Sequence, residues 1–366
     1  MPGGGAHGYP ADYVLGLLLY ASLLIHAVCF FKLFPPRWRR LRLVLGNVVV
    51  FVCLLASLAL LAESYLRFIY VGTESFGVTL PARRWFALHV DLNALGYRDG
   101  EWTRDKPPGV RRLAITGDSF VYGWGLEAVR DRFSDRLQMQ FNERAPGTVE
   151  VMNVAKPGWD TGDQLKPVRD MIERYGVDEV VLGYVANDIE RLLPTRPDFD
   201  PTKPPLCQLF DTDSSALVEW LYYRLIAPRA PTVRGYHNWL LAGYRTPELW
   251  QQQEQRLADL LELCRQHGVT FRVALLPFIQ PGKATFPSDG VHAVLRSFFA
   301  ANGVEVVDLL PALAGEEPTQ LIVSRADAHP NAHAHALFAK AIWEAFYAAG
   351  YAPEVTPSAP PVPSSP

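Results

Sequence analysis

The chain has 366 residues, of which 49% are hydrophobic and 20% are charged, and its formal net charge is -3. This composition excludes a disordered chain. The near balance of 35 Lys and Arg against 38 Asp and Glu gives no basic excess of the kind that nucleic-acid binders carry, so no nucleic-acid partner is expected. The apolar residues are distributed unevenly, because two runs, 13–31 and 43–62, contain no Asp, Glu, Lys or Arg. At ~1.5 Å per residue, each run is long enough to cross the ~30 Å of bilayer hydrocarbon as a helix. The sequence therefore predicts a two-helix transmembrane hairpin over 13–62, after an N-terminal tail of residues 1–12.

The loop between the two apolar runs predicts the orientation of the hairpin. Residues 32–42 contain five Lys or Arg and no acidic residue, and short positively charged loops stay in the cytoplasm. We therefore expect a two-pass protein of the inner membrane, with its N-terminus and everything after about Glu63 on the periplasmic side. A cleaved signal peptide is the alternative for the first run, although the tail before it lacks the positive residues that such peptides carry.

The four cysteines are too few for a disulfide framework. Cys29 and Cys53 lie in the two apolar runs, which leaves Cys207 and Cys264 as candidates for a single disulfide in an oxidising compartment. The sequence does not place these two residues near each other, so their pairing stays open.

From residue 110 onward, short β-branched runs alternate with longer amphipathic stretches. The expected strands are 112–116, 149–155, 179–185, 270–276 and 304–309, and the expected helices are 131–143, 161–175, 247–267, 291–302 and 331–349. Strands separated by helices predict βαβ units and therefore a parallel sheet with helices on both faces. We expect one α/β domain over 110–351, whose ligands bind at the carboxyl ends of the strands.

Three segments lie outside this repeat. Residues 63–109 form a polar connector from the membrane to the sheet, and residues 189–245 are an insertion rich in proline and aromatic residues. A loop of that length usually carries function or forms a small substructure of its own. Within it, residues 214–226 have an N-cap and an amphipathic pattern, which allows contact with the membrane or a partner. Residues 352–366, rich in proline and serine, are expected to be a disordered tail.

The first strand is followed by Gly117-Asp118-Ser119-Phe120-Val121-Tyr122-Gly123. A serine at a strand-to-helix turn can present its hydroxyl at the mouth of the sheet and act as a nucleophile. The same serine can instead cap the helix that follows. The segment has Val121 where the Gly-x-Ser-x-Gly elbow of α/β-hydrolases has its second glycine, which weakens that assignment.

The next two strand ends supply hydrogen-bond donors. Gly158 follows the second strand and offers a backbone N–H, and Asn187 follows the third and offers a side-chain amide. Together with the backbone N–H of Ser119, these are the groups of which an oxyanion hole is made. The candidate substrate contacts are aromatic residues close to these strand ends, Trp124, Trp159 and Tyr184.

A serine nucleophile needs a base, and the base needs a group that fixes its tautomer. His329 and Asp327, which share the loop before the last predicted helix, are the first candidates. Asp289 and His292 form a rival pair, which ranks lower because a helix and the fifth strand still follow it.

The cluster of His329, His333 and His335 with Asp327 also allows a zinc site. His329 and His333 are spaced as ligands on a helix would be, but Pro330 indicates that the helix starts between them. We expect no metal, and we expect His333 and His335 to make packing or hydrogen-bond contacts.

Four groups of residues, in this order, resemble the four sequence blocks of the SGNH/GDSL hydrolases: Gly117-Asp118-Ser119-Phe120, Gly158, Asn187-Asp188 and Asp327-x-His329-Pro-Asn. Residues 93–98 also resemble the entry region of membrane-anchored bacterial members. The resemblance implies a flavodoxin-like three-layer α/β/α domain with a five-stranded parallel sheet, without a cofactor or metal, in which Ser119, Gly158, Asn187 and His329 carry the four signature roles. Two departures stand out. Ala328 alone separates Asp327 from His329, where many members have two residues, and Val185 replaces the glycine of the Gly-x-Asn-Asp block.

These residues predict a membrane-anchored serine esterase that removes acyl groups, acetyl above all, from a cell-surface carbohydrate or a lipid-linked ester. Ser119 would attack the ester, His329 would move the proton and Asp327 would hold the imidazole, while Ser119, Gly158 and Asn187 would bind the oxyanion. Two alternatives stay open. One is an O-acyltransferase that acts with a multi-span membrane partner, and the other is a catalytically silent carbohydrate-binding scaffold.

Overall fold

The computed structural model describes residues 11–33, 35–75, 77, 79–194, 215–279 and 289–351. The chain divides into two compact units that alternate along the sequence. The first, called the N-terminal unit, comprises 1–90, 194–238 and 324–328; the second, called the sheet unit, comprises 91–193, 239–323 and 329–366. The predicted disordered tail and Cys207 lie outside the described residues, so the pairing of Cys207 with Cys264 stays open.

The sheet unit contains a five-stranded parallel sheet in the order β2-β1-β3-β4-β5. Its strands are β1 (Arg111–Gly117), β2 (Val149–Ala155), β3 (Glu179–Val185), β4 (Thr270–Leu276) and β5 (Glu305–Asp308). Every residue of β3 is buried, which explains why, after the buried Glu179, the strand reads as a continuous run without charged residues rather than an alternating one. The strand order is that of flavodoxin-like folds, and the predicted fold class is confirmed.

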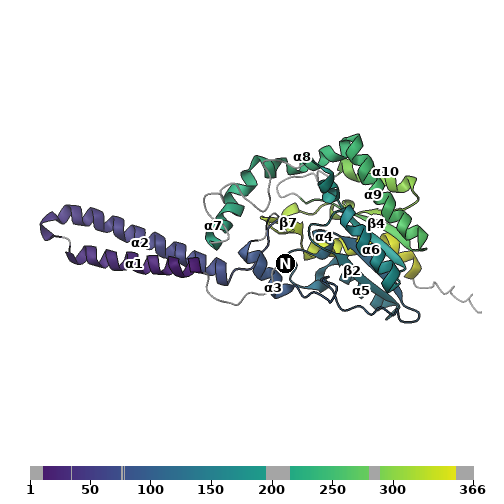
Figure 1. Ribbon diagram of the computed structural model, residues 1–366, viewed down its shortest axis with the longest axis horizontal. Helices are drawn as coiled ribbons and strands as arrows, with labels where there is room; N and C mark the ends of the chain where they lie inside the picture. The colour runs from purple at the N-terminus through teal and green to yellow at the C-terminus, as the bar shows by residue number, and fades with distance from the viewer. Residues whose placement is uncertain are drawn as a thin grey trace, which may run out of the picture. The chain divides into compact units, whose positions relative to one another are not determined.

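Helices cover both faces of this sheet (Figure 1). Since β1→β2 and β2→β3 run in opposite directions across the sheet, right-handed crossovers place their connecting helices on opposite faces. One layer holds α5 (Phe133–Arg144) and α11 (Ala332–Phe346), which pack on each other. The other holds α6 (Thr161–Tyr175), α9 (Pro247–Gln266) and α10 (Asp289–Ala301). All five helices were predicted, with ends that differ by a few residues.

The N-terminal unit begins with the predicted helical hairpin, in which α1 (Ala11–Leu33) lies beside α2 (Arg39–Phe68) (Figure 1). The Tyr13 hydroxyl lies 2.8 Å from the Ser64 Oγ and joins the two helices through their side chains. Both helices are long and apolar enough, by length and composition, to cross a bilayer. They extend past the predicted spans, and the loop between them is shortened by the 3₁₀ helix η1 (Pro36–Trp38).

The connector and the insertion are more regular than the sequence indicated. The connector was expected to have little periodicity, but it contains α3 (Leu80–His89), which starts at the N-cap Thr79 with a proline in its first turn. That signal is present in the sequence and was missed. The described part of the insertion forms α7 (Ala216–Leu221), a π-helical turn η6 (Tyr222–Ile226), η7 (Ala227–Arg229) and α8 (Pro231–Arg245). The Glu63 carboxylate near the end of α2 accepts hydrogen bonds from Ser215 Oγ and from the N–H groups of Ala216 and Leu217 at the start of α7.

Short elements connect the larger ones. They are the helices α4 (Ser119–Tyr122), η2 (Val129–Asp131), η3 (Ala186–Leu192), η8 (Pro311–Leu313), η9 (Pro318–Gln320) and η10 (Ala348–Tyr351), and the paired strands β6 (Ile322–Ser324) and β7 (Asp327–Pro330). Two of them, α4 and β7, carry the residues predicted to react.

Candidate active site

The strand order explains why three distant segments meet at one edge of the sheet. β1 lies between β2 and β3, so Ser119, which follows β1, is flanked by the loops after β2 and β3, which carry Gly158 and Asn187. In parallel α/β sheets the crevice at the carboxyl ends of the strands, where the strand order reverses, is the usual ligand site. Here that reversal falls at β1 and β3.

Ser119 is the first residue of α4, and the residue that caps this helix is Asp118. The Asp118 Oδ1 accepts a hydrogen bond of 2.8 Å from the N–H of Phe120, so the alternative in which Ser119 is the N-cap is wrong. The chain turns this sharply because residue 117 is glycine: a Cβ there would lie 2.3 Å from Val121 and 2.8 Å from the Gly183 carbonyl oxygen. The hydroxyl of Ser119 is therefore not engaged in capping.

His329 is the hydrogen-bond partner of this hydroxyl. Its Nε2 lies 2.8 Å from the Ser119 Oγ, which is the contact that a general base needs to take the proton of a serine nucleophile. The imidazole is framed by aromatic rings, with the centroid of Phe120 at 5.3 Å and that of the half-buried Trp124 at 6.3 Å. The predicted nucleophile and base are brought together.

Two of the expected oxyanion donors are backbone N–H groups. Ser119 opens α4, so its N–H has no acceptor within that helix, and no described residue accepts a hydrogen bond from the N–H of Gly158. Gly158 has a φ of +77°, which strains any other residue, although a Cβ would meet nothing within 4 Å. Arg191 donates to the Gly158 carbonyl at 3.1 Å and pairs with Asp163 at 2.7 Å, which fixes the orientation of this loop.

The third donor, Asn187, is aimed by Asp118. The Nδ2 of Asn187 donates to the Asp118 Oδ2 at 2.9 Å, and because an amide nitrogen carries two hydrogens, one remains for an oxyanion. Asp118 is fully buried, and burial raises the pKa of its carboxyl against the hydrogen bonds from Asn187 and Phe120 and the charge of His329. The sequence placed Asp118 in the motif but gave it no role.

Asp188 holds the turn that carries Asn187. Its Oδ2 accepts from the N–H of Val185 at 2.8 Å and its Oδ1 from the Gln164 amide at 3.1 Å. Burial, and then the negative charge of Asp118, raise the pKa of the Asp188 carboxyl. Val185 has φ -119° and ψ 150°, an extended conformation that any residue adopts, so the missing glycine of this block does not disturb the turn.

Asp327 is fully buried in the N-terminal unit, where the Thr73 hydroxyl donates to its Oδ2. It is the first residue of β7, two positions before His329. Side chains two positions apart in a strand point to the same face. The Asp-x-His spacing is therefore the one that an extended segment needs to present both groups on one side.

The other histidines have separate partners. His292 is buried with its Nδ1 2.7 Å from the Asp308 Oδ1, so the rival base forms a hydrogen bond between α10 and β5. The Nε2 of His333 lies 3.0 Å from Glu316. The Nδ1 of the buried His335 accepts from the N–H of Phe133 at 3.1 Å, and burial lowers its pKa to about 3. In the part of the chain that is described, no three His, Cys, Asp or Glu side chains are grouped as metal ligands would be.

The three aromatic candidates have different surroundings. Trp124 lies beside His329, as described above, whereas Trp159 packs edge-on against Tyr97 at 6.2 Å. Tyr184 is only 1% exposed, and its hydroxyl lies 2.7 Å from the Tyr244 hydroxyl. The prediction that Tyr184 contacts substrate is wrong, because its side chain leaves the fully buried strand β3 into the core.

A sequence model of the GDSL-like lipase/acylhydrolase family matches residues 115–337, more than half of the chain. The chain belongs to this family. The matched segment contains Ser119, Gly158, Asn187 and His329, and the GDSL-like protein is a serine hydrolase that acts on ester bonds. A comparison with curated proteins finds no match.

Solved structures similar to this GDSL-like hydrolase include three enzymes of low sequence identity. The psychrotrophic esterase EstA from a Pseudoalteromonas species is 13% identical, with 64% of this chain and 96% of that chain covered and a TM-score of 0.40. A GDSL-like lipase from Bacteroides thetaiotaomicron is 12% identical, with 66% and 90% covered and a TM-score of 0.37. A catalytic mutant of an acetylxylan esterase from Geobacillus stearothermophilus is 14% identical, with 65% and 95% covered and a TM-score of 0.40.

Proposed function

We propose that this GDSL-like hydrolase is anchored in the inner membrane by α1 and α2, with its catalytic residues on the periplasmic side, and removes acyl groups, acetyl above all, from an ester-bearing cell-surface carbohydrate. The observation that carries the esterase chemistry is the 2.8 Å contact between the Ser119 Oγ and the His329 Nε2. The orientation is supported by the five Lys or Arg between the two apolar helices.

The reaction proceeds through an acyl-enzyme. The Ser119 Oγ attacks the ester carbonyl while His329 accepts its proton, and the negative oxygen of the tetrahedral intermediate is stabilised by the N–H groups of Ser119 and Gly158 and the amide of Asn187. His329 then gives the proton to the departing sugar oxygen. Water, deprotonated by His329, then attacks the acyl-enzyme, and His329 returns that proton to the departing Ser119 Oγ as the carboxylic acid is released. Asp327 stabilises the imidazolium that forms in both halves of the cycle.

The surroundings of His329 support a carbohydrate ester. Trp124 is half-buried beside the imidazole and would offer an aromatic face against which a sugar ring packs. The formal net charge of -3 gives no general attraction to a polyanion, so selectivity would rest on these local contacts.

The test uses the full chain in detergent and a small aryl acetate. Ser119→Ala is expected to abolish turnover, and Ser297→Ala, which removes an exposed serine hydroxyl on α10, is the matched control that keeps it. A fluorophosphonate probe should label the wild-type protein and the control but not Ser119→Ala. Retained turnover in Ser119→Ala would overturn the proposal.

Transfer to another hydroxyl is the second candidate, and the membrane hairpin favours it because it would hold the enzyme beside a multi-span partner that supplies acyl groups. The acyl-enzyme on Ser119 is common to both outcomes, and only the access of water differs. Mass spectrometry after loading Ser119 with acetyl would decide: faster loss of the group to an added polysaccharide than to water indicates an O-acyltransferase.

A further inference from the structure

The chain that leaves α2 contacts the strand segment that carries Asp327. α2 ends at Phe68, and within seven residues the chain reaches Thr73, Glu74 and Ser75. Thr73 and Asp327 are 2% and 0% exposed, and the Thr73 hydroxyl donates to the Asp327 Oδ2. A hydrogen bond between two buried groups that far apart in sequence links the carboxylate to the segment after α2.

Ser75 binds the backbone on both sides of Asp327. Its N–H donates to the Ala326 carbonyl at 3.0 Å, and its Oγ accepts from the N–H of Ala328 at 2.7 Å. Thr73 therefore holds the side chain of Asp327 while Ser75 holds the peptide groups before and after it. We call these three hydrogen bonds the Asp327 clamp.

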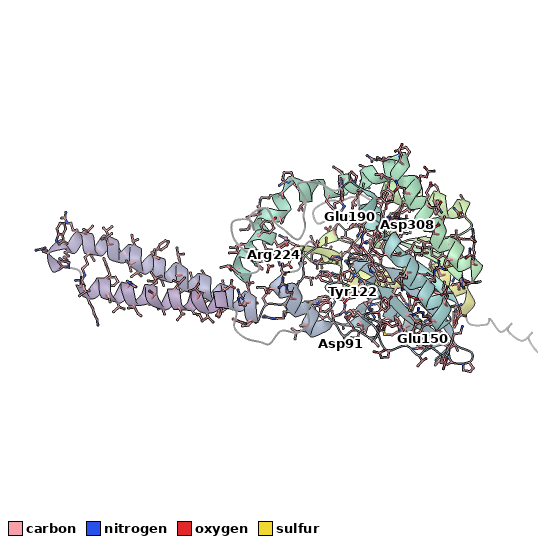
Figure 2. The ribbon with its side chains drawn as sticks, viewed as in Figure 1. Asp91, Tyr122, Glu150, Glu190, Arg224 and Asp308 are labelled. Atoms are coloured by element: carbon pink, nitrogen blue, oxygen red, sulfur yellow. The ribbon has the colours of Figure 1, made fainter. Side chains whose placement is uncertain are left out.

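Glu74 anchors the middle of this segment in a different way. Its carboxylate accepts from the Thr79 hydroxyl at 2.5 Å and lies 3.8 Å from Arg224 of η6 (labelled in Figure 2). Burial raises the pKa of Glu74 to about 7, with a smaller contribution from the charge of Asp327. Thr73 and Ser75 thus bind the Asp327 segment, while the residue between them binds the N-cap of α3 and the insertion.

We propose that Thr73 and Ser75 are positioning residues for catalysis: the segment directly after the second apolar helix fixes the carboxylate that orients the catalytic base. This inference rests on the proposed function, in which Asp327 acts on His329. In that function the Asp327 carboxylate holds the imidazole of His329, which follows two positions later in β7, so a shift of Asp327 would change how the imidazole is held. Orientation of that kind affects the chemical step and leaves ground-state binding of the ester unchanged.

The test compares Thr73→Val, Thr73→Ser and Thr148→Val in the full chain in detergent. Thr73→Val keeps the shape of the side chain but removes its hydrogen-bond donor, so that the Asp327 carboxylate is no longer held in place, and kcat for an aryl acetate should fall ~10- to 100-fold. KM should stay within about 3-fold of the wild type, and Thr73→Ser should restore kcat to the same margin. Thr148→Val removes a threonine hydroxyl that bonds the Ala145 carbonyl and should leave both constants unchanged.

Two results separate this inference from the proposed function. Wild-type kcat in Thr73→Val, together with inactive Ser119→Ala, overturns the clamp and leaves the esterase assignment intact. Activity in Ser119→Ala overturns the esterase assignment itself. If Thr73→Val does not fold, Ser75→Ala decides instead: a fall in kcat without a matching change in KM supports the clamp, and unchanged kcat refutes it.

Discussion

The contact between Asp118 and Asn187 yields the sharpest prediction about catalysis. Asp118 accepts from Phe120 through Oδ1 and from Asn187 through Oδ2, at 2.8 and 2.9 Å. Asp118→Asn can keep its Oδ1 on the N–H of Phe120 and so keep the cap of α4, but an NH₂ group then takes the place of Oδ2. Two amide donors would face each other, and Asn187 would turn out of the position in which it binds the oxyanion.

The magnitude follows from the role of one donor. Removing a single oxyanion-hole hydrogen bond costs about 2.7–4 kcal/mol, or ~10²- to 10³-fold in kcat, and this is the loss expected for Asn187→Ala. If Asp118 acts through Asn187, Asp118→Asn should lower kcat by a similar factor. The double variant should then fall no more than about 3-fold below Asn187→Ala, because residues that share one interaction are not additive.

The assay is a double-mutant cycle on kcat for an aryl acetate, with fluorophosphonate labelling of Ser119 to confirm that each variant keeps a reactive nucleophile. Asn302→Ala is a matched control, since among the described residues its amide donates to the Phe298 carbonyl at the end of α10 and to none of the groups of the active site. If the losses of Asp118→Asn and Asn187→Ala multiply instead, Asp118 acts on the reaction independently of Asn187 and the reasoning is refuted.

Three further predictions concern backbone strain and pH. Gly158→Ala has open space for its Cβ but a φ of +77°, which costs about 1–2 kcal/mol in an alanine. The melting temperature should therefore fall by only about 2–8 °C, while kcat should fall at least ~10-fold because the N–H of residue 158 leaves its position. An unchanged kcat would remove Gly158 from the oxyanion hole. The pKa of His335 in the folded state is lowered from 6.5 to about 3, so the unfolded chain takes up a proton first on acidification. The contribution of His335 to the free energy of unfolding is therefore fully present above about pH 6.5 and is lost as the pH falls toward 3. His335→Gln keeps an acceptor for the N–H of Phe133. In equilibrium unfolding, its free energy of unfolding should fall by about 3 kcal/mol less than that of the wild type when the pH is lowered from 7 to 4.5. The pKa of Glu74 is raised from 4.5 to about 7, so its contribution to the free energy of unfolding is present below about pH 4.5 and is lost as the pH rises through 7. Between pH 5 and pH 8 the free energy of unfolding of Glu74→Gln should therefore rise by up to about 3 kcal/mol relative to that of the wild type. The same pH dependence in both proteins would contradict the raised pKa.

The sheet unit was predictable because its signals are local. Buried strands such as β3 read as β-branched runs, and α6 begins at Asp160, whose side chain caps the helix together with Asp163. In the insertion the sequence indicated one amphipathic stretch with an N-cap, over 214–226, but not the helix α8. Several contacts at the ends of the insertion's helices come from elsewhere in the chain, as when Glu63 of α2 binds the first residues of α7. A local sequence pattern does not reveal such partners.

The reacting groups were predictable for a related reason. Ser119, Gly158 and Asn187 each follow a strand, and a parallel sheet brings strand ends together whatever the side chains are. The sequence did not reveal which polar residues hold those groups in place. Asp118 and Asp188 were visible as parts of motifs, but their roles depend on hydrogen bonds to Asn187 and Val185. Tyr184 was misjudged because proximity to a strand end says nothing about which face its ring takes.

For Asp327, the residue and its spacing from His329 were visible in the sequence, but the structure was needed to show what holds it. Its spacing from His329 departs from the more common Asp-x-x-His, which suits a turn, and the structure accounts for the shorter spacing because β7 is extended. An extended segment gives its carboxylate few local hydrogen-bond partners, since neighbouring side chains point to the opposite face. Support must then come from other parts of the chain: Thr73 donates to the carboxylate itself, and Ser75 binds the backbone beside it, both from more than 250 residues earlier. The Asp-x-His spacing and the Asp327 clamp are therefore linked. An Asp in an extended strand needs support from a distant part of the chain, and here that support comes from the segment that follows the second apolar helix.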